Sequence, residues 1–217
     1  MNLRRISWKI IAISSILIGL YPLIYYIVDM QNQGLLQTKP RELINNNIWY
    51  TLFYVHITFG GVALLIGWSQ FNSTFRTRSV KTHRLVGKIY LLSVLLSSVA
   101  GLFIAFFASG GLITAMGFGS LAVIWFISGI KAYTSVMKKD FIQHEYWAIR
   151  NYALTFAAVM LRIYLPLLIM MFHGDFFPAY RIVSWLSWIP NLIVAELIIH
   201  SKSKMSAFNR WTHQKSV

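Results

Sequence analysis

Six apolar stretches, each long enough to cross a lipid bilayer as a helix, constrain this chain more than any other feature. They cover residues 8–28, 49–70, 86–108, 112–134, 149–172 and 182–200. A bilayer core of roughly 30 Å requires about 20 helical residues. In lipid, only helices and closed barrels satisfy every backbone polar group. The sequence therefore predicts an all-α fold: a polytopic bundle of six transmembrane helices, with residues 1–217 forming a single integral membrane domain.

The composition agrees with a surface that faces lipid. The chain is 57% hydrophobic and 12% charged, and soluble domains carry about twice that charged fraction. Its formal net charge of +14 would suggest nucleic acid binding in a soluble protein. Here the basic residues lie between the apolar stretches, so they indicate topology and no nucleic acid partner. The chain has no cysteine, which excludes disulfides, thiolate metal sites and a cysteine nucleophile.

The positions of Lys and Arg predict the orientation. Sixteen of them fall in the termini and connectors assigned to the cytoplasm, and three, Lys39, Arg41 and Arg181, fall outside. This bias predicts that both ends lie in the cytoplasm, N-in and C-in, in a multi-pass protein of the bacterial cell (inner) membrane. The run from Ile10 to Val28 is long enough to be an uncleaved first helix. The basic tail, 202–215, predicts contact with anionic lipids at the cytoplasmic face.

Arg162 is the only Lys or Arg that belongs to neither the cytoplasmic nor the outside set, and it lies within the fifth stretch, about 20 Å from the inner edge. Arginine near the bilayer centre costs about 2.5–3.5 kcal/mol on insertion scales. Either Arg162 reaches the outer interface, helped by a bend at Pro166, or it faces the bundle interior and meets an anion or a polar partner. The second interpretation is favoured, because His144, Asn151 and Arg162 lie along one helical face. Thr155 continues that face.

His56 lies at a depth similar to that of Arg162, on the second stretch. Small residues and Gln70 follow along its face at spacings of three and four, which allows another helix to approach closely. His56 is therefore either a partner in an interhelical hydrogen bond or a functional group, as a haem ligand or a proton carrier. Both interpretations stay open.

His83 and His144 open the third and fifth stretches at equal depths near the inner interface. Each of them alone is explained by a solvated histidine in a basic loop. Together they are candidates for one site, because they lie at equal depths on helices that could be neighbours. Glu196, with Asn191 one turn before it, places a carboxylate in the inner half of the sixth stretch. Its expected partner is Arg150, His144 or His83. Pairing of Glu196 with Arg162 is disfavoured by a depth difference of roughly 12 Å.

Several of these residues form a recognisable pattern. The segments are His56 with Gly60-Gly61; Gly67-Trp68-Ser69-Gln70-Phe71; His83-Arg84-x-x-Gly87-x-x-Tyr90; His144-x-x-Trp147-x-x-Arg150-x-Tyr152; Leu161-Arg162; and Pro190-Asn191 with Ala195-Glu196. Together they resemble the bacterial predicted membrane proteins of domain of unknown function 2306, over about residues 50–197. The resemblance implies a recurring set of polar residues and no settled activity.

Three functions follow as hypotheses. The first is membrane redox chemistry with haem b or a quinone-like cofactor, held by His56, His83, His144, Arg162, Gln70, Arg150, Asn151, Asn191 and Glu196. No metal other than haem iron is expected, bound through His56, His83 or His144. The second is a small-solute or proton-coupled transporter, for which a homodimer would compensate for the small number of helices. The third is a non-catalytic membrane scaffold, in which the polar groups satisfy one another.

Overall fold

The structure, a computed structural model, describes residues 3–28 and 34–215, and in this part of the chain it contains helices and no strand. The helices of the first half are α1 (Leu3–Leu20), η1 (Tyr21–Leu23), α2 (Ile24–Ile27), η2 (Leu36–Thr38), α3 (Arg41–Ile44), α4 (Asn47–Gly67), η3 (Trp68–Phe71), α5 (Ser73–Arg78) and α6 (Val80–Ala105). Those of the second half are α7 (Leu112–Met137), α8 (Phe141–Thr155), α9 (Ala157–Met171), α10 (Phe176–Leu186) and α11 (Ile189–Lys215).

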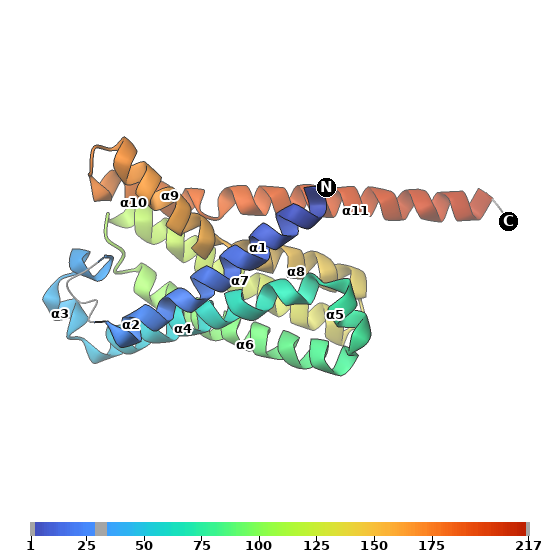
Figure 1. The fold of residues 1–217 in the computed structure, drawn as a ribbon, viewed down its shortest axis with the longest axis horizontal. Helices are drawn as coiled ribbons and strands as arrows, with labels where there is room; N and C mark the ends of the chain where they lie inside the picture. The colour runs from blue at the N-terminus through green and yellow to red at the C-terminus, as the bar shows by residue number, and fades with distance from the viewer. Residues whose placement is uncertain (1–2, 29–33, 216–217) are drawn as a thin grey trace.

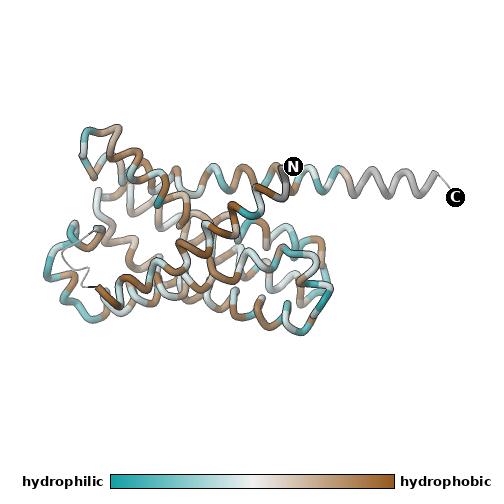
Figure 2. Tube along the Cα trace, viewed as in Figure 1, coloured by the Kyte–Doolittle hydropathy of each residue, from teal (hydrophilic) through white to brown (hydrophobic). Residues whose placement is uncertain are grey.

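Six segments are long and apolar enough to cross a membrane, which confirms the predicted number. They run Ile6–Ile27, Asn47–Phe71, Val80–Ala105, Leu112–Met137, Phe141–Met171 and Phe176–Met205. Many of their large apolar side chains are exposed, and Figure 2 shows stretches of hydrophobic residues, in brown, along the helices. The chain is thus a membrane-spanning helical bundle.

Helices α4, α6, α7 and α8 form the core of the bundle. They pack in the order α4 on α6, α6 on α7, and α7 on α8. Helix α1 crosses this group obliquely against α4, α10 packs on α7 and on α9, and α11 packs on α8 (Figure 1). Since lipid supplies no hydrophobic force between helices, close approach depends on small residues. A Cβ on Gly61 would lie 2.7 Å from the carbonyl oxygen of Gly19, which marks the α1–α4 crossing.

Three spans differ from the predicted ranges at their ends or in their continuity. The third begins at Val80 rather than 86, because the Ser79 side chain caps it by accepting from the Thr82 N–H. The fifth begins at Phe141, capped by Asp140, and it is interrupted at Phe156, between α8 and α9. Pro166, where a bend was expected, lies inside α9.

The sixth span is also two helices, α10 and α11, which meet at Ser187 and Trp188 just before Pro190. Helix α11 continues past the predicted end at residue 200 and projects beyond the bundle (Figure 1).

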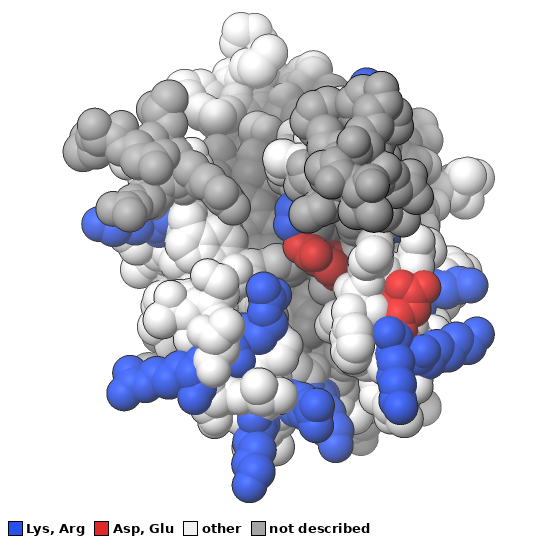
Figure 3. Space-filling view, turned by 90° about the vertical axis from the view of Figure 1, so that its right-hand side faces the viewer, with Lys and Arg blue, Asp and Glu red and all other residues white. Residues whose placement is uncertain are grey.

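The two ends of the bundle differ in charge. We call the end formed by α5, the start of α8 and the exit of α11 the basic end, and the other the distal end. Figure 3 faces the basic end, where Lys and Arg side chains gather. At the distal end, Lys39 donates to the Phe107 carbonyl, and Arg181 Nε donates to the Gly110 carbonyl at 2.8 Å. These cations therefore bind the turn that joins α6 and α7.

Candidate functional site

A buried hydrogen-bond network connects α6, α7 and α8 in the middle of the bundle. The Tyr90 hydroxyl donates to Asn151 Oδ1 at 2.6 Å and contacts Thr155 Oγ1 at 2.9 Å. Asn151 Nδ2 donates to the Trp125 carbonyl and to Ser128 Oγ, both at 2.9 Å. Trp125 Nε1 donates to Thr155 Oγ1 at 2.9 Å. All five residues are buried, so the network holds three helices in register.

Asn151, a predicted cofactor-binding residue, therefore makes its hydrogen bonds to the protein itself. Trp125 and Ser128 were missed, because a tryptophan and a serine in an apolar stretch give no distinctive spacing. Helix α7 supplies two members of the network, and Ser15 of α1 forms a buried 2.8 Å hydrogen bond with the Tyr152 hydroxyl.

His83 and His144 lie nearly two helical turns closer to the basic end than this network. Each is seven residues before a network member: His83 precedes Tyr90, and His144 precedes Asn151. Seven residues are nearly two helical turns, so each histidine lies on the same face as that residue and about 10 Å nearer the basic end. The two side chains are within electrostatic range of one another. The two histidines thus lie at similar depths, while their pairing stays a prediction.

Both histidines have a ring nitrogen that the protein leaves without a hydrogen bond. The Nδ1 of His144 lies 2.8 Å from the Ala132 carbonyl oxygen. Because a carbonyl only accepts, this nitrogen carries the proton, and Nε2 of a neutral ring has the free lone pair. The Nδ1 of His83 is buried and has no hydrogen-bond partner in the described structure. A ring N–H held by a backbone carbonyl with the other nitrogen free, as in His144, is typical of metal-ligating histidines.

Gln70 lies beside the same histidine pair. Its Oε1 would be 3.2 Å from a Cβ placed on Gly87, and Gly87 is one turn after His83. The basic residues Arg76 and Arg84 are also within electrostatic range of His83. The basic end of the bundle thus brings together Gln70, the two histidines and two guanidinium groups.

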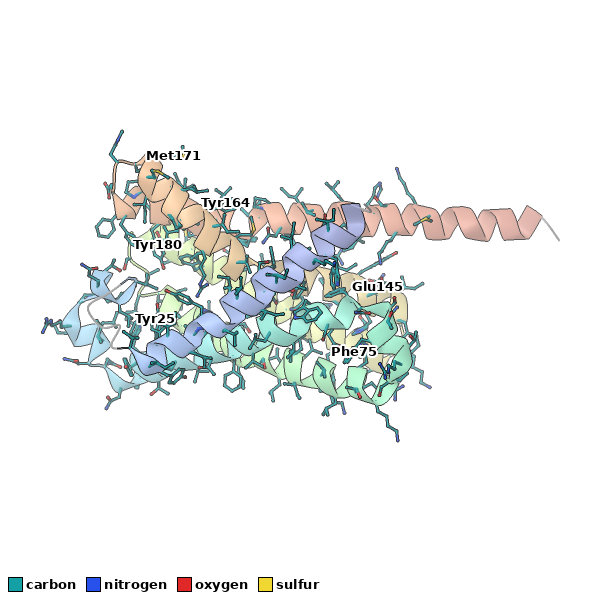
Figure 4. The ribbon with its side chains drawn as sticks, viewed as in Figure 1. Tyr25, Phe75, Glu145, Tyr164, Met171 and Tyr180 are labelled. Atoms are coloured by element: carbon teal, nitrogen blue, oxygen red, sulfur yellow. The ribbon has the colours of Figure 1, made fainter. Side chains whose placement is uncertain are left out.

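Glu196 pairs with Arg150, one of the three partners expected for it. Arg150 Nε and Nη2 donate to the two carboxylate oxygens at 2.5 and 2.8 Å, and the guanidinium lies over the Trp147 ring at 4.7 Å. Asn191 Nδ2 donates to the Ala153 carbonyl at 3.2 Å. Glu145, labelled in Figure 4, pairs with Lys202. Together these contacts join α8 to α11.

His56 and Arg162 form a second, separate site toward the distal end. They line one cavity of about 70 Å³ between α1, α4 and α9. Arg162 Nη1 donates to the Ala158 carbonyl at 2.9 Å, and its guanidinium lies 4.6 Å from the Tyr21 ring centroid. Arg162 therefore faces the bundle interior, as favoured. The break at Phe156 between α8 and α9 lies between Arg162 and Asn151, so the polar face predicted for the fifth span crosses two helices.

The His56 ring is held on its α6 side. Its Nδ1 lies 2.9 Å from the Ser97 carbonyl oxygen, and the Ser97 hydroxyl donates to the His56 carbonyl at 2.8 Å. A Cβ on Gly101 would lie 2.8 Å from the same ring nitrogen. His56 thus makes the predicted interhelical hydrogen bond and also lines a cavity, and Nε2 is the nitrogen left for that cavity.

The two sites cannot share one ligand of ordinary size. His56 and Gln70 lie fourteen residues apart on α4 and η3, a separation of about 20 Å at helical rises. The predicted set of nine site residues therefore divides into a basic-end group and the His56–Arg162 cavity, with Asn151 in the network between them.

Comparisons with known proteins support the fold and leave the activity open. No curated protein and no solved structure matches the chain. A family described as "Predicted membrane protein (DUF2306)" matches residues 53–199. This match covers more than half of the chain and contains both groups of candidate residues. The chain is therefore a multi-pass membrane protein that belongs to the DUF2306 family of predicted membrane proteins.

Proposed function

We propose that the basic-end histidines, His83 and His144, would hold haem b, which would supply one-electron chemistry in the membrane. The observation that carries the proposal is the hydrogen bond of 2.6 Å between Tyr90 and Asn151. It places α6 and α8 in register, and each helix has its histidine seven residues closer to the basic end. Cofactor sites in helical bundles are built in this way, from side chains on facing helices.

The surroundings of the two histidines suit this cofactor. The proton of His144 is engaged by a backbone carbonyl, which orients the ring and leaves Nε2 free for iron. Arg76 and Arg84 lie within electrostatic range of His83, and their guanidinium groups would donate hydrogen bonds to the propionate carboxylates of a bound haem.

The cavity at His56 does not suit haem or a quinone ring. Its volume of about 70 Å³ is below the 150 Å³ or so of a cavity that accepts benzene. Drug-sized ligands occupy roughly 300–1,000 Å³. His56 is therefore not assigned as an iron ligand.

The test is the absorbance spectrum of the purified protein, expressed with haem supplied, reduced minus oxidised. We expect the Soret and α bands of six-coordinate haem b, and the loss of most of this signal in His83→Ala and in His144→Ala. His200→Ala is the matched control, since His200 is exposed on α11, and it should retain the bands. Absence of a Soret band in the wild-type protein, or its persistence in both variants, would contradict the proposal.

Transport of a small solute is the second candidate function. The observation that favours it is the cavity shared by His56 and Arg162, two polar residues at one depth inside the spans. Its test is a flux into liposomes that Arg162→Gln abolishes and His200→Ala does not.

A further inference from the structure

We infer that the cavity between His56 and Arg162 binds a small monovalent anion, and that His56 takes up a proton with it. The inference deepens the second candidate function by naming a ligand class for its site. The experiment below measures anion binding and does not depend on transport. An anion that binds to the protein but is not carried into liposomes would therefore contradict the transport function and leave the binding inference standing.

The first argument is the charge of Arg162. A guanidinium has five N–H donors, and the structure gives one hydrogen bond, to the Ala158 carbonyl, and one ring contact, with Tyr21. Within residues 3–28 and 34–215, the ion pairs are those of Arg150 and Lys202, so Arg162 has no carboxylate. A cation without a counter-charge in a low-dielectric interior is costly by several kcal/mol. A bound anion would supply the missing charge.

The second argument is the depth at which the two side chains meet. His56 is nine residues from the distal start of α4, and Arg162 is nine residues from the distal end of α9. Both therefore lie about 14 Å from that end. The headgroup of a lipid would have to leave the interface to reach this depth, so a free ion is the better occupant.

The third argument is size. Water occupies about 30 Å³ in the liquid, so a cavity of about 70 Å³ holds two waters or one ion such as chloride, bromide or nitrate. The walls beside the two polar groups are apolar or small, including Ile18, Pro22 and Gly60. A larger organic anion does not fit.

The role of His56 follows from its hydrogen bonds. Since Nδ1 faces the Ser97 carbonyl, Nε2 of the neutral ring is a bare lone pair, which repels an anion. After protonation, Nε2 becomes a donor and the ring carries a positive charge. The ionisable groups facing this cavity are Arg162 from α9 and the Arg162 neighbours Tyr21 and Tyr25. From α6, Ser97 and Gly101 face the ring and do not titrate in this range.

The experiment measures the thermal unfolding of the full chain in detergent, in chloride-free gluconate buffer. Sodium bromide or sodium nitrate is titrated at constant ionic strength, with gluconate as the anion that is too large. We expect a saturable rise in Tm, about 3–6 °C at ten times the half-saturating concentration. The half-saturating concentration should fall up to tenfold per pH unit between pH 8 and 6.

Three variants test the assignment. Arg162→Met removes the charge, and Ala158→Leu fills the cavity while keeping Arg162, so both should lose the saturable shift. Ala158→Leu carries the test if Arg162→Met does not fold. Lys138→Gln removes an exposed cation at the basic end, so this control should keep the shift. The inference is overturned if gluconate has the same effect as bromide, or if either folded cavity variant responds like wild type. A half-saturating concentration independent of pH, or one that still varies with pH in His56→Gln, would overturn the role of His56.

Discussion

At the scale of single residues, each polar site lies against a glycine of α6. A Cβ on Gly101 would lie 2.8 Å from His56 Nδ1, and a Cβ on Gly87 would lie 3.2 Å from Gln70 Oε1. Counting residues along the spans predicted that His56 and Arg162 lie at one depth, because helical rise is constant. Counting could not reveal Gly101, since a glycine in an apolar helix has the same pattern whether it faces a neighbour or lipid.

Gly101→Ala is expected to destabilise the protein by about 1–3 kcal/mol, as overpacking does in other cores. The new Cβ would lie 2.8 Å from His56 Nδ1 and 2.9 Å from Cε1, so the ring must move away from the Ser97 carbonyl. Thermal unfolding in detergent measures the loss. Gly119→Ala is the matched control, because its Cβ meets Leu102 Cδ1 only at 3.9 Å. Equal stability of the two variants would contradict the packing argument.

The lowered pKa of Lys39 predicts that the free energy of unfolding rises with pH. Burial lowers its pKa to about 8 in the folded chain from 10.5. Between these values the unfolded chain binds more protons than the folded one, so the free energy of unfolding increases as pH rises through this interval. We expect an increase of about 1–3 kcal/mol from pH 7.5 to 9.5, measured by chemical or thermal unfolding.

Lys39→Gln should flatten this dependence, since an amide can still donate to the Phe107 carbonyl but does not titrate. Arg41→Gln, two residues further on, should keep it. A wild-type stability that falls over the same interval would show that Lys39 is not the controlling group.

At the scale of elements, the last two spans are joined by a continuous seam of polar contacts. Asn191 meets Ala153, Glu196 meets Arg150, and Lys202 meets Glu145. The residue numbers increase along α11 while those of their partners on α8 decrease, because the two helices are antiparallel. Sequence reasoning named Arg150 as a candidate partner from its depth alone. It did not find the break at Phe156, because an apolar run is equally compatible with one helix or two.

The Arg150–Glu196 pair should show a coupling free energy of about 2 kcal/mol, typical of hydrogen bonds to charged groups. The measurement is a double-mutant cycle of Arg150→Gln, Glu196→Gln and the double variant, by unfolding in detergent. Each single variant leaves one charge without its partner, so we expect the double variant to lose less stability than the two singles added together. Strict additivity of the two changes would mean that the seam is held by its apolar contacts.

At the scale of the whole molecule, the charge asymmetry and the six spans were readable from the sequence, because membrane insertion acts on composition and length. The division of the candidate residues into two sites could not be predicted from the sequence, because it depends on which helices become neighbours. The N-in, C-in orientation remains a prediction, and the gathering of basic side chains at one end (Figure 3) is consistent with it.

The absence of cysteine makes that orientation directly testable. Gln37→Cys at the distal end and Lys138→Cys at the basic end both replace exposed residues. In intact cells, a membrane-impermeant thiol reagent should label Gln37→Cys strongly and Lys138→Cys only after permeabilisation. The reverse pattern would establish that both termini lie outside.

The contact between Arg162 and the Tyr21 ring also has a consequence for biogenesis. The ribosome releases the first span long before the fifth, so the aromatic ring is already in the bilayer when the guanidinium reaches the translocon. The Arg162 guanidinium therefore enters the bilayer beside the Tyr21 ring. A chain that lacks its first span should fail to insert the fifth, although the sequence of the fifth is unchanged.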